Sequence, residues 1–244
     1  MNTEQTNRML RALKLSGMAN RYELMIEMAG KVAPPDGHTM IAMLVEAEQE
    51  YRKRRKTEIN LKQAHLRYQL NAQEIECSQA RGLTSEQWLL LCEGRYIEQA
   101  VNVIIIGPTG VGKSAVACAL ARQACLQGTK VLYFNMNRLI EEIKAAKLNG
   151  SYLKFLDQLA KTPLLLLDDF GLKSLDKDVR VAFYEILEDR SGKGSTIITS
   201  QLPIANWYDR FGESTLAEAC LDRLTGNAEK ISLTGASRRV KKNK

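Results

Sequence analysis

The chain has 244 residues, of which 45% are hydrophobic, so it has room for one α/β domain of ordinary size and a smaller appendage. Its apolar runs are far shorter than the roughly 20 residues of a membrane span, and its polar first ten residues lack the apolar segment of a secretion signal. The formal net charge of +7 favours partners with negative charge. We therefore expect a cytoplasmic protein without a membrane partner.

Five cysteines are spaced too irregularly to suggest a disulfide framework or a metal site. Their number is odd, no pair shows C-x-x-C spacing, and the two histidines, His38 and His65, are isolated. We predict that all five are reduced side chains of the interior: Cys77, Cys92, Cys118, Cys125 and Cys220.

Residues 1–70 are predicted to form a small helical domain. Apolar residues recur at steps of three and four in two stretches, from Leu10 to Met18 and from Ile41 to Val45, as on one face of a helix. The segment GKVAPPDGH at 30–38 interrupts this pattern with glycine and proline. The pattern predicts an all-α domain, to which we assign DNA binding or assembly.

Basic residues are concentrated in two segments. Seven lysines and arginines accompany the single acid Glu58 in residues 51–68, and residues 230–244 carry six without any acid. Such a run is either a solvated face or a surface for a phosphate backbone. In the first segment we predict contacts with duplex DNA, made by Arg52, Lys53, Arg54, Arg55 and Lys56. For the C-terminal segment both interpretations stay open.

A connector at residues 71–100 is predicted to end in a short helix, because Thr84 and Gln87 form a capping box and Gly94 follows as a stop signal. From residue 101 to 244, apolar runs typical of buried strands alternate with segments of helical spacing. The predicted strands are VNVIII, KVLYF, PLLLLD and STIITS, and the helices between them are residues 113–128, 137–150, 151–161 and 176–192. This alternation predicts an α/β fold, a parallel sheet covered by helices with ligands at the carboxyl ends of its strands.

The first predicted strand runs into GPTGVGKS, residues 107–114, which fits the pattern G-x-x-x-x-G-K-[ST] between a strand and a helix. Glycines let successive N–H groups point into one concavity, and the helix N-terminus adds partial positive charge there. Lys113 is expected to reach the β- and γ-phosphates of a nucleotide, and the hydroxyl of Ser114 to ligate Mg²⁺. We predict that the loop binds ATP through Gly107, Pro108, Thr109, Gly110, Val111, Gly112, Lys113 and Ser114.

The predicted strand at 163–168 ends at Asp168 and is followed directly by Asp169, so both acids are expected at the carboxyl edge of the sheet, beside the phosphate loop if the two strands are neighbours. Asp168 is predicted to hold Mg²⁺, and Asp169 to orient or deprotonate the attacking water. Ser200 and Gln201 end another strand and carry polar groups able to contact the γ-phosphate or this water. Together they predict hydrolysis of ATP to ADP and phosphate, the alternatives being solvated loop acids and an ordinary turn.

The order of five segments resembles the IstB proteins, the ATPase helpers of transposases in one class of bacterial insertion sequences. The segments are LKLSGMANRYE, GPTGVGKS, LLLLDDFG, STIITSQLP and LDRLTGNAEKISLTGASRR, and they span nearly the whole chain. IstB proteins are related to the DnaC helicase loaders within the AAA+ superfamily. The resemblance implies an AAA+ P-loop ATPase, associated with the nucleoid, whose homo-oligomer (a ring or spiral) deforms duplex DNA and presents it to a transposase.

The resemblance also assigns roles to residues outside the phosphate loop. By motif match, Asp168 and Asp169 fall on the Walker B pair and Gln201 on sensor 1. Arg223 of LDRL falls on the arginine finger, and we expect it to complete the site of a neighbouring subunit. The alternative is that Arg223 pairs with an acid of its own helix, Asp222 or Glu218.

Two departures from the family pattern affect these assignments. Relatives usually have an acid and a methionine where this chain has Ala236 and Arg238, so sensor 2 is assigned to either Arg238 or Arg239. Many AAA+ proteins have glutamate in place of Asp169, whose side chain is one methylene shorter.

Two other functions share parts of this pattern. A replicative helicase loader would use the same ATPase core with a surface for a helicase instead of a transposase. A DNA-binding adaptor that senses the nucleotide without hydrolysing it would lack turnover stimulated by DNA. A guanine-specific switch is excluded, because the chain has no [NT]-K-x-D element.

Overall fold

The computed structural model describes residues 2–31, 33–211 and 214–238, and the chain divides into two compact units, residues 1–59 and 60–244. The first unit contains helices α1 (Thr3–Ala12), α2 (Ser16–Glu27) and the larger part of α3 (Gly37–Ala64). The small all-α domain predicted at the N-terminus is therefore confirmed. The unit boundary lies within α3, whereas the periodicity placed it near residue 70.

A buried carboxylate ties the helices of the first unit together. Glu48 on α3 accepts hydrogen bonds from the backbone N–H groups of Gly17 at 2.7 Å and Met18 at 3.2 Å, in the first turn of α2. Its other carboxylate oxygen accepts a hydrogen bond from Nε of Arg52 at 2.7 Å. Burial opposes ionisation of Glu48, but Arg52 and the two N–H groups outweigh it and lower the pKa of this carboxyl. Arg52, a predicted DNA contact, thus also has a structural role.

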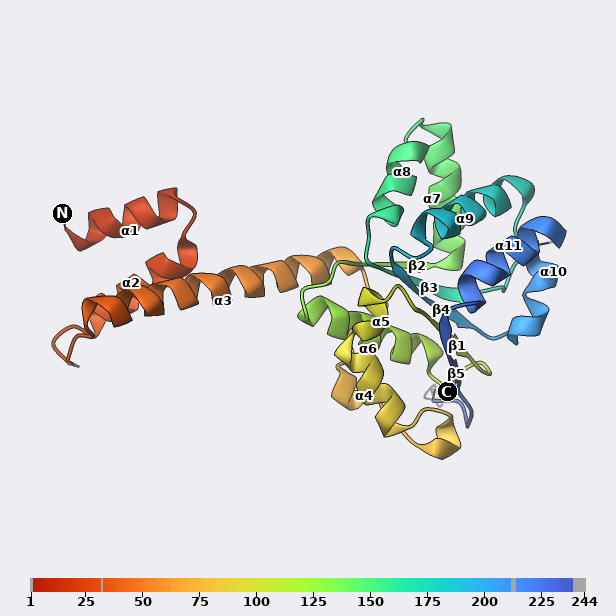
Figure 1. Cartoon of the computed structure of the whole chain (residues 1–244), viewed down its shortest axis with the longest axis horizontal. Coiled ribbons are helices and arrows are strands. Elements are labelled where there is room, and N and C mark those ends of the chain that lie inside the picture. The colour runs from red at the N-terminus through yellow and green to blue at the C-terminus, as the bar shows by residue number, and fades with distance from the viewer. Residues whose placement is uncertain (1, 32, 212–213, 239–244) are drawn as a thin grey trace, which may run out of the picture. The chain divides into compact units, whose positions relative to one another are not determined.

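The second unit is built around a parallel sheet in the order β2–β3–β4–β1–β5 (Figure 1). Four of its strands were expected from apolar runs. The fifth was not, because Ile231 is its only buried residue and the strand lies at the sheet edge. The strands are β1 (Asn102–Ile106), β2 (Val131–Asn135), β3 (Leu164–Phe170), β4 (Ser195–Ser200) and β5 (Ala228–Ser232).

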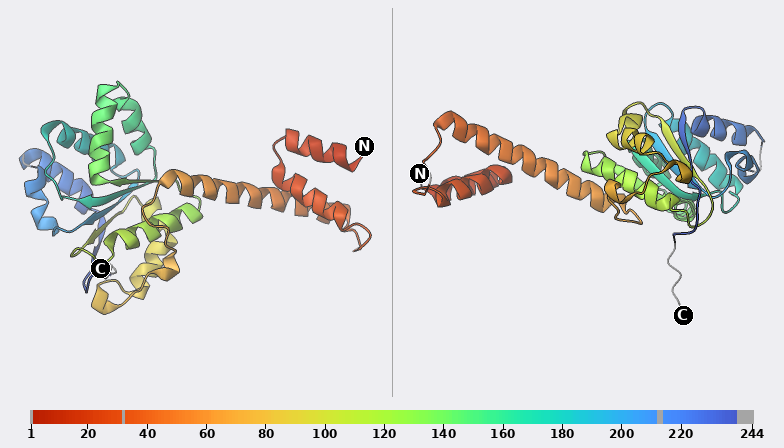
Figure 2. Two further views of the ribbon diagram at one scale, coloured as in Figure 1. Left: turned by 180° about the vertical axis from the view of Figure 1, so that it is seen from behind. Right: turned by 90° about the horizontal axis from the view of Figure 1, so that it is seen from below.

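Helices cover both faces of the sheet, as the views in Figures 1 and 2 show. One face packs against α4 (Ser85–Glu93), α5 (Arg95–Glu98) and α6 (Lys113–Leu126). The other face packs against α7 (Met136–Leu148), α8 (Tyr152–Ala160), α9 (Lys177–Arg190), α10 (Tyr208–Phe211) and α11 (Ser214–Thr225). Successive strand residues alternate between the two cores: Val103 and Ile105 join the first, and Ile104 joins the second. The predicted α/β fold with a covered parallel sheet is confirmed.

The predicted connector packs as part of the second unit. It contains the 3₁₀ turns η1 (Ala72–Glu74) and η2 (Gln79–Arg81) as well as α4 and α5, and a third such turn, η3 (Ile204–Asn206), follows β4. Oγ1 of Thr84 accepts a hydrogen bond from the backbone N–H of Gln87 at 3.2 Å, which is one of the two hydrogen bonds of the predicted capping box. Gly94 ends α4 with a φ of 84°, as the sequence predicts. Within the described residues, no helix combines the length and apolarity that a membrane span requires.

Candidate functional site

A turn of glycines joins β1 to α6. Gly107, Gly110 and Gly112 have φ values of 150°, 89° and 97°, which side chains rarely adopt. A Cβ atom at Gly107 would lie 2.2 Å from the carbonyl oxygen of Leu233, and one at Gly110 would lie 2.2 Å from Oγ of Ser237. The loop therefore requires glycine both for its own path and for the close approach of the segment after β5.

Lys113, the first residue of α6, is only 5% exposed. Its Nζ donates a hydrogen bond to the carbonyl oxygen of Pro108 at 2.9 Å, across the loop. The ammonium thus lies where the loop N–H groups and the helix N-terminus also concentrate positive potential, which suits a polyphosphate. The pocket beside the loop is lined by Tyr68, Leu70, Thr109, Gly110, Gly112, Lys113, Ser114, Ala115, Asp169, Gln201 and Arg238.

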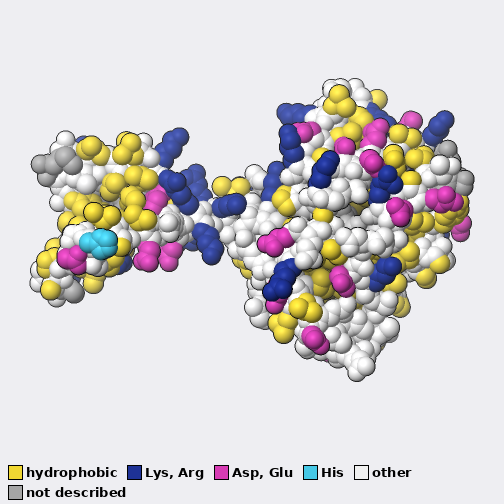
Figure 3. Space-filling model, viewed as in Figure 1, with side chains coloured by type: hydrophobic (Ala, Val, Ile, Leu, Met, Phe, Trp, Pro, Cys, Tyr) yellow, Lys and Arg dark blue, Asp and Glu magenta, His cyan; other side chains and the backbone are white. Residues whose placement is uncertain are grey.

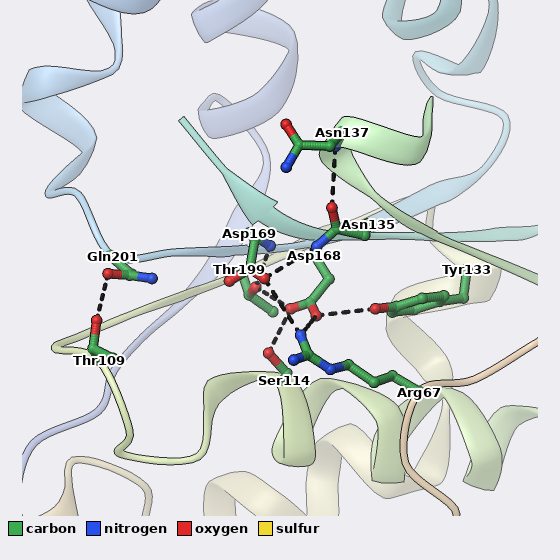
Figure 4. Close-up of polar contacts among 10 residues, drawn as sticks. All are labelled: Arg67, Thr109, Ser114, Tyr133, Asn135, Asn137, Asp168, Asp169, Thr199 and Gln201. Carbon is green, nitrogen blue, oxygen red and sulfur yellow. Dashed lines mark hydrogen bonds and ion pairs between the residues drawn. The ribbon is translucent and has the colours of Figure 1, made fainter. Parts of the chain in front are cut away.

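Asp168, near the end of β3, is fully buried and lies at the centre of the polar contacts in Figure 4. Its Oδ1 accepts hydrogen bonds from Oγ of Ser114 at 2.7 Å and Oγ1 of Thr199 at 2.6 Å. Its Oδ2 accepts from the hydroxyl of Tyr133 at 3.1 Å and lies 3.4 Å from Nη1 of Arg67. Burial and the negative charge of Asp168 raise the pKa of Tyr133, so this phenol stays a proton donor.

The contact between the phosphate loop and the acids forms by an unexpected route. The sequence predicts that the acids lie beside the loop if β1 and β3 are neighbours, but β4 lies between these two strands. Ser114, in the first turn of α6, spans this distance and reaches Asp168 directly. Mg²⁺ prefers oxygen ligands, and here a hydroxyl and a carboxylate oxygen lie 2.7 Å apart. The residues present therefore fit the predicted ion.

Asp169 has a left-handed backbone conformation, with a φ of 62°. The register between β3 and β4 shifts at this point, and the backbone N–H of Asp169 donates to Oγ1 of Thr199 at 3.0 Å. Its carboxylate accepts a hydrogen bond from Nδ2 of Asn135 at 3.0 Å and lies 3.4 Å from Nη1 of Arg67. For a residue other than glycine this conformation costs about 1 kcal/mol or more, and such strain is common at functional sites. The bend directs the carboxylate towards the pocket, which Asp169 lines.

Gln201 and Ser200 have different surroundings in the structure. Oε1 of Gln201 accepts a hydrogen bond from Oγ1 of Thr109 at 2.5 Å, so Gln201 lies beside the phosphate loop (Figure 4). The hydroxyl of Ser200 donates to the carbonyl oxygen of Phe170 at 2.8 Å and accepts from the N–H of Leu202 at 3.1 Å. This corrects the expectation for Ser200, because its buried hydroxyl is engaged in the turn after β4 and does not line the pocket.

Arg223 lies at the other end of β1 from the phosphate loop. Its carbonyl oxygen accepts a hydrogen bond from Nδ2 of Asn102, the first residue of β1, whereas the loop follows the last. Its guanidinium donates to Glu188 on α9 and stacks over the ring of Tyr184, 5.1 Å from the centroid. The alternative to a role in a neighbouring subunit was an ion pair with Asp222 or Glu218 of the same helix. Arg223 does pair with an acid, but that acid is Glu188 on α9. The hydrogen bond to Glu188 raises the pKa of Arg223.

The segment after β5 brings one of the two sensor 2 candidates to the loop. The backbone N–H of Arg238 donates to the carbonyl oxygen of Gly110 at 2.9 Å, and its side chain lines the pocket and pairs with Glu76 at 2.6 Å. Arg239 lies outside the described residues. A third arginine, Arg81, was not predicted; it is buried and donates to the carbonyl oxygen of Val111 in the loop at 3.3 Å.

Four further residues of the site were missed by sequence reasoning: Arg67, Tyr133, Asn135 and Thr199. Asn135 and Thr199 are polar residues at the carboxyl ends of strands, so their positions offered a usable signal. Tyr133 lies within a strand and had no such signal. Arg67 was counted only as one charge of the basic segment, because nothing local distinguishes it from its neighbours.

The five predicted DNA contacts lie on α3, where Figure 3 shows Lys and Arg side chains gathered. All five are exposed. Arg52 is held by Glu48, and Arg54 lies 3.9 Å from Glu58 and 5.8 Å from the ring centroid of Tyr51.

The covered parallel sheet, the glycine turn and the acids of β3 give this chain the fold of AAA+ P-loop proteins. The structure resembles the crystal structure of the DnaC helicase loader (TM-score 0.56, 21% identity, covering 67% of this chain and 96% of that one). It also resembles AMPPCP-bound DnaA from Aquifex aeolicus (TM-score 0.58, 17% identity, covering 70% and 51%). At these identities the likeness concerns the fold alone.

The family model of the IstB-like ATP binding proteins matches residues 8–244, and the chain belongs to this family. The insertion sequence ATP-binding protein y4pL of Sinorhizobium fredii is 39% identical over 94% of each chain. The ATP-binding protein of insertion sequence IS21 from Pseudomonas aeruginosa is 30% identical over 96% of this chain and 88% of its own.

Proposed function

We propose that this protein is an Mg²⁺-dependent ATPase that assembles as a homo-oligomer on duplex DNA, deforms it and delivers it to a partner transposase. The observation that carries the catalytic part is the hydrogen bond between Ser114 and Asp168, which joins the phosphate loop to the acids of β3. The proposed role in transposition is supported by relatives named as insertion sequence ATP-binding proteins.

Binding of ATP is assigned to the loop and its lysine. The N–H groups of residues 107–114 and Nζ of Lys113 bind the phosphates, and Lys113 exchanges its hydrogen bond with Pro108 for one with the nucleotide. Ser114 and Asp168 hold Mg²⁺, which when bound neutralises charge on the β- and γ-phosphates. Arg238, from the pocket wall, adds a further positive charge.

Hydrolysis is assigned to Asp169 and Gln201. Asp169 accepts a proton from, or orients, the attacking water, and Asn135 fixes the direction of its carboxylate through the 3.0 Å hydrogen bond. Gln201 breaks its contact with Thr109 to bind the water or the γ-phosphate. A positioned base of this kind accelerates a reaction by about 10²–10⁴-fold.

Arg223 is proposed to complete the site of a neighbouring subunit. It is at the opposite end of β1 from its own phosphate loop, and a guanidinium there serves catalysis only in another chain. We expect Arg223→Ala to lower ATP turnover by about 100-fold or more, since it removes a charge that stabilises the transferred phosphoryl group. Arg223→Lys, which keeps the charge without the planar fork, should lose less.

A mixing assay tests this role in trans. Arg223→Ala and Lys113→Ala subunits, each inactive alone, are combined in equal amounts with DNA. If the subunits assemble at random, about a quarter of the interfaces combine an intact loop with an intact arginine. Turnover should therefore recover to about a quarter of that of the unmodified protein. Confirmed co-assembly without any recovery would contradict the proposal, as would full turnover by Arg223→Ala alone.

DNA binding is proposed to be largely independent of sequence and to depend on α3. Because Arg52 also supports the first unit through Glu48, the informative variant replaces Lys53, Arg55 and Lys56 by alanine and leaves Arg52 unchanged. Each phosphate contact contributes about −0.9 to the slope of log affinity against log salt on duplex DNA, so this slope should become less steep by about 2 to 3. Affinity should fall alike for unrelated sequences.

A control variant with the same change in charge replaces Lys130, Lys154 and Lys161, which are exposed residues of the second unit. It should retain the salt slope of the unmodified protein. The slope is measured by fluorescence anisotropy with labelled duplexes over a range of salt concentrations. An α3 variant with an unchanged slope would remove this segment from the DNA-binding surface.

The proposed partner is tested by affinity capture from the host cell. A tagged chain with ATP and DNA should retain its partner transposase, and the Lys113→Ala variant should retain less. Capture of a replicative helicase instead would favour the helicase-loader alternative. Absence of ATP turnover, with and without DNA, would favour the nucleotide-sensing adaptor.

A further inference from the structure

Arg67 bridges the two acids of the site. Its Nη1 lies 3.4 Å from Oδ2 of Asp168 and 3.4 Å from Oδ2 of Asp169, and Figure 4 shows the guanidinium between the acids and the first turn of α6. Both acids belong to β3, whereas Arg67 follows the end of α3. A single positive charge from a distant part of the chain therefore offsets part of the negative charge of the two carboxylates assigned to Mg²⁺ and to water.

The chain just before Arg67 is buried in the core, whereas the Arg67 side chain is partly exposed. The thiol of Cys118 on α6 contacts the backbone of Arg67 and Tyr68, and burial raises the pKa of this thiol to about 11, so it stays neutral. Neighbouring Leu66 is buried in the core below α6. The Arg67 side chain itself is 42% exposed and lies 5.4 Å from the ring centroid of Tyr68. The guanidinium can therefore leave the acids by side-chain rotation alone.

The geometry of the contacts places Arg67 in competition with a cation. Oδ1 of Asp168 accepts hydrogen bonds from the hydroxyls of Ser114 and Thr199. Either hydroxyl can keep this bond or rotate away from it when a cation binds. Oδ2 of both acids faces the guanidinium at a distance longer than a strong charge-assisted hydrogen bond. Before any phosphate is counted, a divalent ion held by Asp168 would leave one more positive charge beside Arg67 than these carboxylates compensate, and it would compete with the guanidinium for the same acid.

We propose that Arg67 is a displaceable counter-ion of the two acids. Its guanidinium pairs with them in the nucleotide-free protein and leaves them when the metal–nucleotide complex binds. While it contacts both acids, the guanidinium reduces the repulsion between the two adjacent carboxylates. It also lowers the affinity of that site for a divalent cation, so its release is coupled to loading with nucleotide. This inference rests on the proposed Mg²⁺ site.

The test compares binding of AMPPCP with and without Mn²⁺ to the full-length protein. Nucleotide affinity is measured by calorimetry, once with Mn²⁺ and once with EDTA, and free Mn²⁺ is counted by electron paramagnetic resonance. Arg67→Ala should increase the ratio of the two affinities by about three- to tenfold, the range of one or two partly exposed ion pairs. Arg67→Lys, a point charge that cannot bridge both acids, should increase it less.

Arg122→Ala is the matched control. Arg122 on α6 donates a hydrogen bond to Oδ1 of Asn71 at 3.1 Å, and so supports the same connecting segment, but within the described part of the chain it pairs with neither acid. The ratio should not change in this variant. An unchanged or decreased ratio in Arg67→Ala would overturn the proposal, and Arg67→Lys supplies the same comparison if the alanine variant is unstable. If the unmodified protein binds AMPPCP equally with Mn²⁺ and with EDTA, the metal site itself, and with it the proposal, is wrong.

Discussion

Replacing Lys113 by alanine is expected to weaken ATP binding by about 100-fold, because a hydrogen bond from a charged donor to phosphate is worth about 1.5–3 kcal/mol. Lys113 is nearly buried and held across the loop by Pro108, so its ammonium is already positioned before the nucleotide arrives. Little side-chain entropy is lost on binding, which places the effect at the upper end of that range. The measurement is calorimetric titration with a non-hydrolysable ATP analogue.

The control for Lys113→Ala is Lys161→Ala, which removes the same charge from an exposed position directly after α8, where the lysine pairs with Asp157. It should bind the analogue normally. Thermal unfolding without nucleotide shows whether Lys113→Ala keeps its fold. A folded Lys113→Ala protein with unchanged affinity would show that the glycine turn is not the phosphate site.

Replacing Asp169 by asparagine is expected to separate binding from turnover. Asparagine tolerates the left-handed conformation that Asp169 adopts, so the bend at the end of β3 should persist. The amide cannot accept a proton from water, and turnover should fall by about 10²–10⁴-fold. Affinity for ATP should change only slightly, since Lys113, Ser114 and Asp168 remain. Steady-state hydrolysis and nucleotide titration are measured on the same preparation.

Asp157→Asn on α8 is the matching control for this second prediction, because it makes the same chemical change in an exposed ion pair. It should hydrolyse ATP at the normal rate. Equal loss of binding in Asp169→Asn and Lys113→Ala would contradict the separate roles assigned to the two residues. Normal turnover by Asp169→Asn would show that another group of the pocket acts as the base.

Much of the site is predictable because its chemistry is local in sequence. The glycines, Lys113 and Ser114 lie within eight consecutive residues, and the backbone conformation of a short turn depends mainly on those residues. The acids could be placed at a sheet edge because an apolar run precedes them directly. The same kind of pattern led to four of the five strands, but not to β5, whose edge position leaves most of its side chains solvated.

Side-chain direction at the strand ends was decided by the tertiary structure. Ser200 and Thr199 are adjacent and both polar, yet only Thr199 reaches Asp168, because successive residues of a strand face opposite sides of the sheet. Which of the two faces the acid depends on the register between β4 and β3, and that register shifts where β3 bends at Asp169. A sequence pattern of strands does not specify such a shift.

The amino-acid sequence by itself determined the fold class, the phosphate loop and the family of this protein, since each depends on residue types at short, regular spacing. Only the tertiary structure decided that β4 separates β1 from β3 and that Ser114 spans the gap. It alone brought Arg67 to Asp168, about 100 positions away in the chain, and paired Arg223 with Glu188. Contacts between residues so distant in sequence depend on the packing of whole elements, which no local pattern encodes.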